Sequence, residues 1–292
     1  MAQRLKRYLV VIPPFAWLLL FFLIPFFVVF QVSLADLRLQ RPPFTPIFEW
    51  DGWWPTSFTG DFENYVFLLK DSLYINSYLN SVKTAFISSM ICLIVGYPIA
   101  YVIARATPSW RNTLLLLVIL PFWTSSLLRI YALIGMYSTN GFINTTLLNI
   151  GIISEPLQLM NTDFAVYSAI VITYLPLMIL PLYSTLQKLD GDLLEASSDL
   201  GASPLKSFWQ VTLPLSAPGI VAGCLLVFIP AVGEYVIPAL MGGPEQLMIG
   251  KTLWTEYFNN RDWPLASSVA MVMLAVLVVP MMMLRNSQGV KD

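Results

Sequence analysis

Long apolar stretches separated by polar connectors dominate the pattern of this chain. A helix needs about 20 mostly apolar residues to cross the hydrocarbon layer of a membrane. Six stretches meet this requirement, at residues 9–34, 78–104, 113–137, 164–186, 215–240 and 264–284. We therefore predict an all-α integral membrane protein with six transmembrane helices in a single domain covering residues 1–292.

Prolines and glycines interrupt several of these stretches. Proline removes a backbone donor and kinks a helix, which is tolerated in lipid where neighbouring groups satisfy the freed carbonyls. The spans carry Pro25, Pro98, Pro121, Pro176, Pro181 and Pro230. Gly219 and Gly223 form a small-xxx-small pair, which permits close helix packing. Kinked spans favour a transporter or channel over a passive anchor.

Basic residues set the expected orientation. The connectors on one side of the six spans, with the two ends of the chain, hold nine Lys or Arg in 52 residues, whereas those on the other side hold five in 92. An excess of Lys and Arg marks the cytoplasmic side. We therefore expect both termini in the cytoplasm. The first stretch follows Arg4, Lys6 and Arg7, and its length predicts a retained span rather than a cleaved signal peptide.

Composition agrees with a membrane protein and excludes several function classes. Hydrophobic residues make up 57% of the chain and charged residues 11%, against about 25% charged in soluble domains. The chain has no histidine, which excludes His-dependent nucleophiles and His-ligated zinc. Its net charge of −1 gives no indication of a nucleic-acid partner. We expect no catalytic residue and no metal site.

The connector 187–214 carries the most informative local chemistry. Its sequence predicts a short helix capped by Asp192, with Glu195 three residues later in a capping-box arrangement. Gly201 stands where a left-handed C-terminal cap is expected, and Ser203 with Pro204 restarts a helix. From physical chemistry alone this segment is an interfacial loop helix.

The spacing within the connector adds a family resemblance. It resembles EAA-x3-G-x9-I-x-LP, the pattern of membrane subunits in binding-protein-dependent ABC importers. The matching positions are Glu195, Ala196, Ser197, Gly201, Val211, Leu213 and Pro214. Serine replaces the second alanine and valine replaces isoleucine, while every gap is kept. The resemblance implies the type I importer permease fold, in which this loop forms a cytoplasmic coupling helix.

Further stretches resemble the membrane subunits of polyamine importers, first those of putrescine systems and then those of spermidine systems. These stretches are GYPIAY at 96–101, RNTLLLLVILPFWTS at 111–125, FIPAVGEYVIPALMGGP at 228–244 and FNNRDWPLAS at 258–267. The resemblance implies a non-catalytic permease in the bacterial inner membrane. It also implies a heterodimer with a second permease subunit, two cytoplasmic ATPase subunits that bind ATP and Mg²⁺, and a periplasmic polyamine-binding protein.

Two charges fall deep within predicted spans, Arg129 in the third and Glu234 in the fifth. If both helices are continuous, a rise of 1.5 Å per residue places them roughly 9–12 Å below the outer edge. Charges buried in membranes face the bundle interior and usually pair. Three interpretations stay open: an Arg129–Glu234 ion pair, Glu234 as a partner of a cationic substrate, and pairing with the second permease subunit.

Aromatic side chains near that depth are candidate pathway residues, because aromatic faces replace the hydration that a cation loses. They are Tyr235, Trp123, Tyr131 and Tyr174. Packing explains each of them equally well. Three other functions stay open: an ABC permease for another small solute, a self-sufficient secondary transporter, and a membrane-embedded enzyme. Neither buried ion sites with internal repeats nor clustered nucleophiles appear in the sequence.

Overall fold

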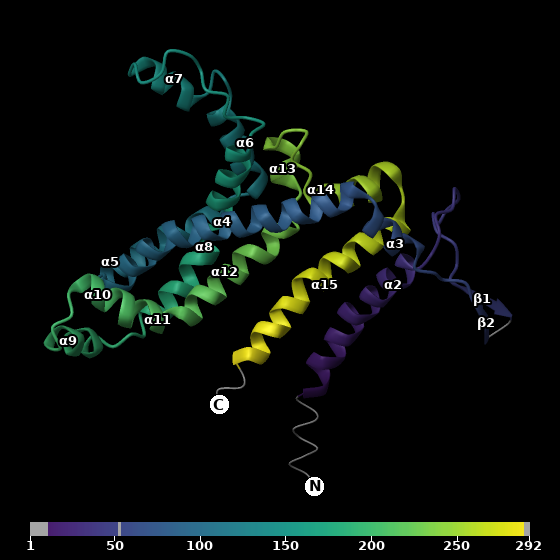
Figure 1. Cartoon of the computed structure of the whole chain (residues 1–292), viewed down its shortest axis with the longest axis horizontal. Helices are drawn as coiled ribbons and strands as arrows, with labels where there is room; N and C mark the ends of the chain where they lie inside the picture. The colour runs from purple at the N-terminus through teal and green to yellow at the C-terminus, as the bar shows by residue number, and fades with distance from the viewer. Residues whose placement is uncertain (1–10, 52–53, 289–292) are drawn as a thin grey trace, which may run out of the picture. The chain divides into compact units, whose positions relative to one another are not determined.

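The structure is a computed structural model that describes residues 11–51 and 54–288, and it is mostly helical (Figure 1). The chain divides into two compact units, residues 1–78 with 252–292 (unit 1) and residues 79–251 (unit 2). Helix α4 (Ser72–Arg105) runs through this division. The single permease domain expected from the sequence therefore stays a prediction.

Unit 1 joins the two ends of the chain. Residues 11–33 are helical, with a π-helical turn η1 (Leu19–Leu23) leading into α2 (Ile24–Ser33). Helix α2 packs beside α15 (Trp263–Gln288), as Figure 1 shows in purple and yellow. The Ser268 hydroxyl donates to the Ser33 carbonyl at 3.0 Å across this contact. Helix α3 (Glu63–Lys70) and the π-helical segment η4 (Thr255–Asn260) also belong to this unit.

A short hairpin in unit 1 departs from the all-helical pattern. Strands β1 (Phe48–Asp51) and β2 (Trp54–Phe58) pair antiparallel, with Phe48 opposite Phe58. Their ring centroids lie 5.5 Å apart. The hairpin lies within the first long connector, where aromatic residues alternate with polar ones and favour strands. The fold class is otherwise as predicted.

Unit 2 is built on two helices that pack along their lengths, α8 (Asp163–Leu186) and α12 (Ala217–Val232). The predicted close approach is confirmed, because a Cβ on Gly219 would lie 2.6 Å from the Thr185 hydroxyl oxygen, and one on Gly223 would lie 2.7 Å from the Met178 sulfur. The remaining elements of this unit are α5 (Pro108–Ile119), η2 (Leu120–Trp123), α6 (Ser126–Tyr137), α7 (Phe142–Asn149), α9 (Asp192–Asp199), α10 (Pro204–Ser207), η3 (Phe208–Thr212), α11 (Leu213–Leu215) and α13 (Val236–Met241). Helix α14 (Ile249–Trp254) begins in unit 2 and ends in unit 1.

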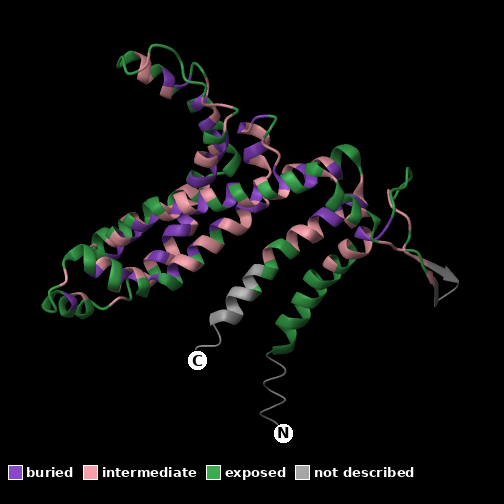
Figure 2. Cartoon of the chain, viewed as in Figure 1, coloured by how far each residue is buried: buried purple, intermediate pink, exposed green. Residues whose placement is uncertain are grey.

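Within residues 11–51 and 54–288, three helices are long and apolar enough to span a membrane: Val11–Ser33, Ser72–Arg105 and Asp163–Leu186. Two further pairs of apolar helices are each bent at a short break, and they raise the number of candidate spans to five if each pair is counted as one span. Trp263–Val279 is a shorter apolar helix. Apolar side chains are exposed over residues 11–24, the N-terminal part of the first helix (Figure 2), as expected of a segment that contacts lipid or a partner. The count of six spans stays a prediction.

Two predicted spans are broken rather than continuous. The third, expected over 113–137, consists of α5 with η2 and then α6, and the axis turns by 92° between Pro108–Trp123 and Ser126–Asn149. Pro121 lies at this break, where its ring and missing N–H oppose a continuing helix. The fifth, expected over 215–240, consists of α12 and α13 with a break at residues 233–235. The depth calculated for Arg129 and Glu234 assumed continuous helices and does not apply.

Candidate functional site

The connector 187–214 forms two short helices joined by a tight cap. Helix α9 ends in a Schellman motif: the Gly201 N–H donates to the Ser198 carbonyl at 2.9 Å and the Ala202 N–H donates to the Ser197 carbonyl at 3.1 Å. Gly201 has φ of +79°, so its predicted left-handed conformation is confirmed. Ser203 caps α10, accepting from the Lys206 N–H, and Pro204 is its first residue, as predicted.

The N-terminal cap of α9 differs from the prediction. The helix begins at Asp192 itself, so that Gly191 is the N-cap and the carboxylate of Asp190 accepts from the Asp192 N–H at 3.2 Å. A carboxylate just before the helix satisfies this donor, and the acidic groups of Asp192 and Glu195 then lie in the first turn, near the positive end of the helix dipole. The capping box is therefore not formed.

The two short helices are joined by a buried pair of hydroxyls. Ser197 on α9 and Ser207 on α10 hydrogen-bond to each other, and both are buried. Serine stands at this position where the family pattern has a second alanine, and Ser207 gives its hydroxyl a partner. The opposite surface is apolar and exposed: Leu200 is 89% exposed and Leu205 is 69% exposed. Glu195 is also exposed, and its carboxylate makes no hydrogen bond within the described chain.

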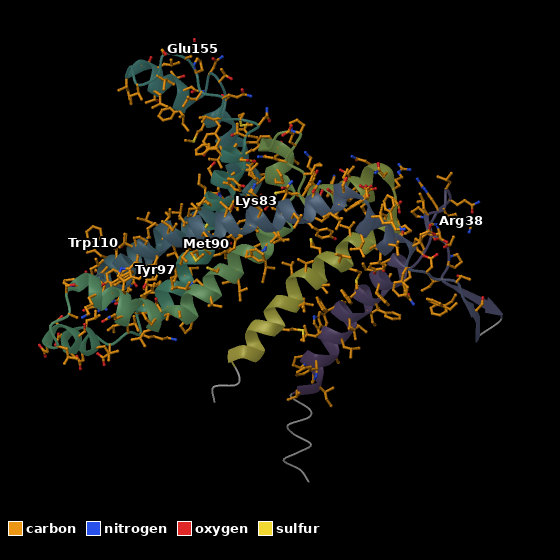
Figure 3. The ribbon with its side chains drawn as sticks, in the orientation of Figure 1. Arg38, Lys83, Met90, Tyr97, Trp110 and Glu155 are labelled. Atoms are coloured by element: carbon orange, nitrogen blue, oxygen red, sulfur yellow. The ribbon has the colours of Figure 1, made fainter. Side chains whose placement is uncertain are left out.

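The connector is attached to the helical core of unit 2 through Tyr97 on α4, which Figure 3 labels. Its hydroxyl lies 2.9 Å from that of Ser216, and its ring meets the ring of Phe208 edge-on at 5.6 Å. Ser216 stands at the 64° bend between Pro204–Leu215 and Ala217–Val232. The matched positions Val211, Leu213 and Pro214 lie in η3 and α11, immediately before this bend. The connector is therefore joined to α4 by these contacts and is continuous with α12 through the bend at Ser216.

A second candidate site lies at the break in the fifth predicted span. The Tyr174 hydroxyl, from α8, donates to Oε2 of Glu234. Oε1 of Glu234 accepts from the N–H groups of Val236 at 3.0 Å and Ile237 at 3.3 Å, so the side chain caps α13. All three donors are neutral, so none of them compensates the charge of a carboxylate. A half-buried anion with neutral partners is suited to attract a cation.

Arg129 does not pair with Glu234 among the residues that the structure describes. Its guanidinium donates to the Pro121 carbonyl at 2.5 Å, and its Nε is buried without a partner. The Pro121 carbonyl also accepts from the Thr124 N–H at 3.3 Å and from the Thr124 hydroxyl at 2.7 Å, so Arg129 joins donors that already close the turn at the break. The Arg129–Glu234 ion pair, one of the three interpretations left open, is not formed within the described residues, and each side chain bonds instead at its own helix break.

Of the other pathway candidates, Trp123 is 86% exposed and Tyr131 is 60% exposed, and neither contacts Glu234 through a hydrogen bond within the described chain. Tyr235 adjoins Glu234 in the break. Lys83 on α4 is exposed, and Figure 3 labels it. Among the pathway candidates named from the sequence, Tyr174 is the one whose side chain hydrogen-bonds to Glu234 within the described residues.

Sequence reasoning missed a buried carboxylate in unit 1. Glu256 is 9% exposed in η4, and it accepts from the Tyr74 hydroxyl and the Asn260 amide, both at 2.8 Å. It lies in the connector 241–263, and its partner Tyr74 is far away in sequence, so no local pattern indicates its burial. The basic residues Arg4, Lys6 and Arg7 lie outside the described residues.

Comparisons with known proteins identify the family. Residues 96–292 match the model of the family described as binding-protein-dependent transport system inner membrane component. The chain is 42% identical over 267 residues to the spermidine/putrescine transport system permease protein PotB of Haemophilus influenzae, covering 90% of this chain and 88% of the relative. It is 44% identical over 215 residues to PotB of Escherichia coli, covering 74% of this chain and 78% of the relative.

A solved structure gives the same fold. The crystal structure of a bacterial alginate ABC transporter, in complex with its alginate pentasaccharide-bound periplasmic protein, contains a chain with a TM-score of 0.69 at 14% identity. The likeness covers 95% of this chain and 92% of that one. The type I importer permease fold expected from the connector is thereby confirmed, and so is the expected family. This chain belongs to the inner membrane components of binding-protein-dependent ABC transport systems.

Proposed function

We propose that this chain is a membrane-spanning subunit of an ATP-driven importer of polyamines. The observation that carries the proposal is the 42% identity, over nine-tenths of the chain, to a permease named for spermidine and putrescine transport. The chemistry of the fifth span agrees with it. Polyamines carry ammonium groups spaced along apolar methylenes, and the break after α12 offers a carboxylate, a phenol and surrounding apolar helix.

Glu234 is proposed as the group that meets an ammonium during passage. Its carboxylate lies just past the C-terminal end of α12, where the helix dipole also favours a cation. The Tyr174 hydroxyl donates to the same carboxylate, and its oxygen keeps lone pairs that can accept from an ammonium group. An anionic solute such as molybdate would be repelled by this carboxylate, so the charge of the site favours a cationic solute within the family.

The connector 187–214 is proposed as the docking element for a cytoplasmic ATPase subunit. It presents exposed leucines, Trp209 at 60% exposure and the unbonded carboxylate of Glu195, which together are suited to an apolar groove with a donor at its rim. Closure of an ATPase pair would move α9, and the contacts of Tyr97 and Ser216 would carry this movement to α4 and α12.

The remaining partners follow from the family in general, which comprises a partner permease, ATPase subunits and a substrate-binding protein. We propose specifically a heterodimer with a different permease subunit, two ATPase subunits and a soluble polyamine-binding protein. We further propose that both termini and the connector 187–214 are cytoplasmic. ATP and Mg²⁺ would be bound by the ATPase subunits and not by this chain. A self-sufficient secondary transporter is disfavoured, because transporters of that class work without an ATPase and need no loop that docks one.

The proposal is tested by reconstituting the complete transporter in lipid nanodiscs and measuring ATP hydrolysis with the soluble binding protein. Putrescine or spermidine should stimulate hydrolysis, whereas molybdate, sulfate and alginate fragments should not. Stimulation by one of these anions and by neither polyamine would reject the polyamine assignment while leaving the importer family intact. Polyamine uptake into proteoliposomes that lack the ATPase subunits would show that transport does not require ATP hydrolysis, and it would reject the proposed ATP-driven mechanism.

A further inference from the structure

Unit 1 contains a pocket of about 880 Å³ that the proposed pathway does not use. One wall is the loop of residues 37–43, which follows α2, and the other is formed by residues 257–263, from η4 to the start of α15. Three arginines line it: Arg38 and Arg41 from the first wall and Arg261 from the second. Figure 3 labels Arg38 on its connector.

This pocket contains most of the basic residues found in the connectors on its side of the predicted spans. The connectors on the side with few basic residues (35–77, 138–163 and 241–263) contain five Lys or Arg in total, and three of the five line this pocket. None of the three guanidinium groups forms an ion pair within the described chain. The neighbouring carboxylate of Asp262 caps α15, accepting from the Leu265 N–H at 2.9 Å. Three exposed guanidinium groups around one pocket make it positively charged, and an anionic group would complement them.

The pocket also presents apolar and aromatic surface. The rings of Tyr257 and Trp263 stack at 5.3 Å with planes 7° apart, and Phe258 is 52% exposed. Leu39, between the two arginines of the loop, is 99% exposed. Arginine beside exposed aromatic side chains is the composition of protein-binding hot spots, from which lysine is depleted, and no lysine lines this pocket.

We propose that this pocket is a docking site for acidic side chains of the soluble polyamine-binding protein. The inference rests on the proposed function. Three guanidinium groups would repel a polyamine, so the pocket is not part of the cation path. Carboxylates on a protein surface are the groups that arginines bind in bidentate geometry. Exposed aromatic side chains beside arginines, with no lysine in the lining, favour a protein over a lipid headgroup as the partner.

The test measures the affinity of the purified, polyamine-loaded binding protein for the complete transporter in nanodiscs of zwitterionic lipid, at low and high salt. The variant carries Arg38→Gln, Arg41→Gln and Arg261→Gln. Since exposed charge pairs contribute roughly 0.2–1 kcal/mol each, its affinity should fall by about tenfold at low salt. Its affinity should also depend less on salt than that of the wild type. Lys70→Gln, an exposed basic residue of the same connector outside the pocket, should change neither quantity.

An unchanged affinity and salt dependence in the triple variant would overturn the proposal, as would an equal loss in Lys70→Gln. A second arm uses nanodiscs containing phosphatidylglycerol: if the triple substitution lowers lipid binding and leaves protein binding intact, the pocket is a lipid site. At saturating binding protein, the triple variant should recover polyamine-stimulated ATP hydrolysis, which shows that the rest of the machinery is assembled. A wild-type complex that no polyamine stimulates would reject the proposed function instead.

Discussion

The hydroxyl of Tyr174 on α8 donates a hydrogen bond to the carboxylate of Glu234, which stands at the break between α12 and α13. The other oxygen of the same carboxylate caps α13 through the backbone N–H groups of Val236 and Ile237. One side chain therefore holds α8, the end of α12 and the start of α13 together with neutral donors only. These bonds fix the position of the carboxylate, and in the proposed function its charge is available to a cation.

Removing the charge of Glu234 should separate its structural role, as the cap of α13, from its proposed role as the partner of a cation. In Glu234→Gln the amide oxygen still caps α13, and the amide nitrogen donates to the Tyr174 oxygen in place of the original bond. Hydrogen bonds to charged groups contribute about 1.5–3 kcal/mol, so polyamine uptake and polyamine-stimulated ATP hydrolysis should fall by about tenfold or more. The thermal unfolding midpoint of the purified complex should change little.

Two controls accompany Glu234→Gln. Tyr174→Phe keeps the charge and removes one hydrogen bond, so it should lower stability by about 1 kcal/mol while retaining the response to polyamine. Arg129→Gln combined with Glu234→Gln should not restore uptake, because Arg129 bonds to Pro121 and not to Glu234. Recovery of both stability and uptake in this double variant would establish an ion pair and reject the pathway role.

The contact between α8 and α12 predicts opposite effects for two glycine-to-alanine changes. In Gly223→Ala the new Cβ would lie 2.7 Å from the Met178 sulfur and 3.1 Å from the Met178 carbonyl oxygen, so overpacking should destabilise the complex by about 1–3 kcal/mol. A Cβ added to Gly135 on α6 would have no described atom within 4 Å, so Gly135→Ala should stabilise by roughly 0.5–1 kcal/mol. Thermal unfolding midpoints of the two variants measure this difference. Shifts of the same sign would contradict the close packing.

The proposed orientation is tested by single cysteines on the two sides, in a chain whose Cys92 and Cys224 are replaced by serine. Ser198 on α9 and Asn149 on α7 are both exposed. Ser198→Cys should react with a membrane-impermeant maleimide only in inside-out vesicles, and Asn149→Cys only in intact cells with a permeabilised outer membrane. The reverse pattern would place the connector 187–214 outside and remove the proposed docking of an ATPase.

Local chemistry predicted local structure well. The helix expected over 164–186 is found at Asp163–Leu186, because its apolar run begins after the capping Thr162. The left-handed Gly201 and the restart at Ser203 and Pro204 are also present, since both depend on residues within a few positions of each other. The family pattern located the connector 187–214 without tertiary information.

Features that depend on distant residues could not be predicted. Pro121 was recognisable as a helix breaker, but the 92° turn depends on how α6 packs, and nothing in the sequence indicates that Arg129 donates to the Pro121 carbonyl. Charge alone suggested that Arg129 and Glu234 pair, whereas each found a nearer partner at its own helix break. The arginine pocket joins residues more than 200 positions apart, and no periodicity in either segment indicates that they meet.

The last prediction concerns the cap between α9 and α10. Gly201 has φ of +79°, and no described atom lies within 4 Å of the position that a Cβ would take. Substitutions there are therefore limited by backbone conformation and not by neighbouring atoms. Valine in the left-handed region costs about 1–2 kcal/mol or more, whereas asparagine is the usual alternative to glycine at this cap.

Gly201→Val should therefore open the cap and displace α10 from α9, whereas Gly201→Asn should keep the Schellman bonds to Ser197 and Ser198. In the reconstituted transporter, Gly201→Val should lower polyamine-stimulated ATP hydrolysis by about tenfold, the factor that corresponds to about 1.4 kcal/mol, and Gly201→Asn should retain most of it. The unfolding midpoint of the whole complex should be similar in both variants, because the cap is exposed and remote from the contact between α8 and α12. If valine and asparagine gave the same activity, the left-handed turn would not be what transmits movement from an ATPase to the spans.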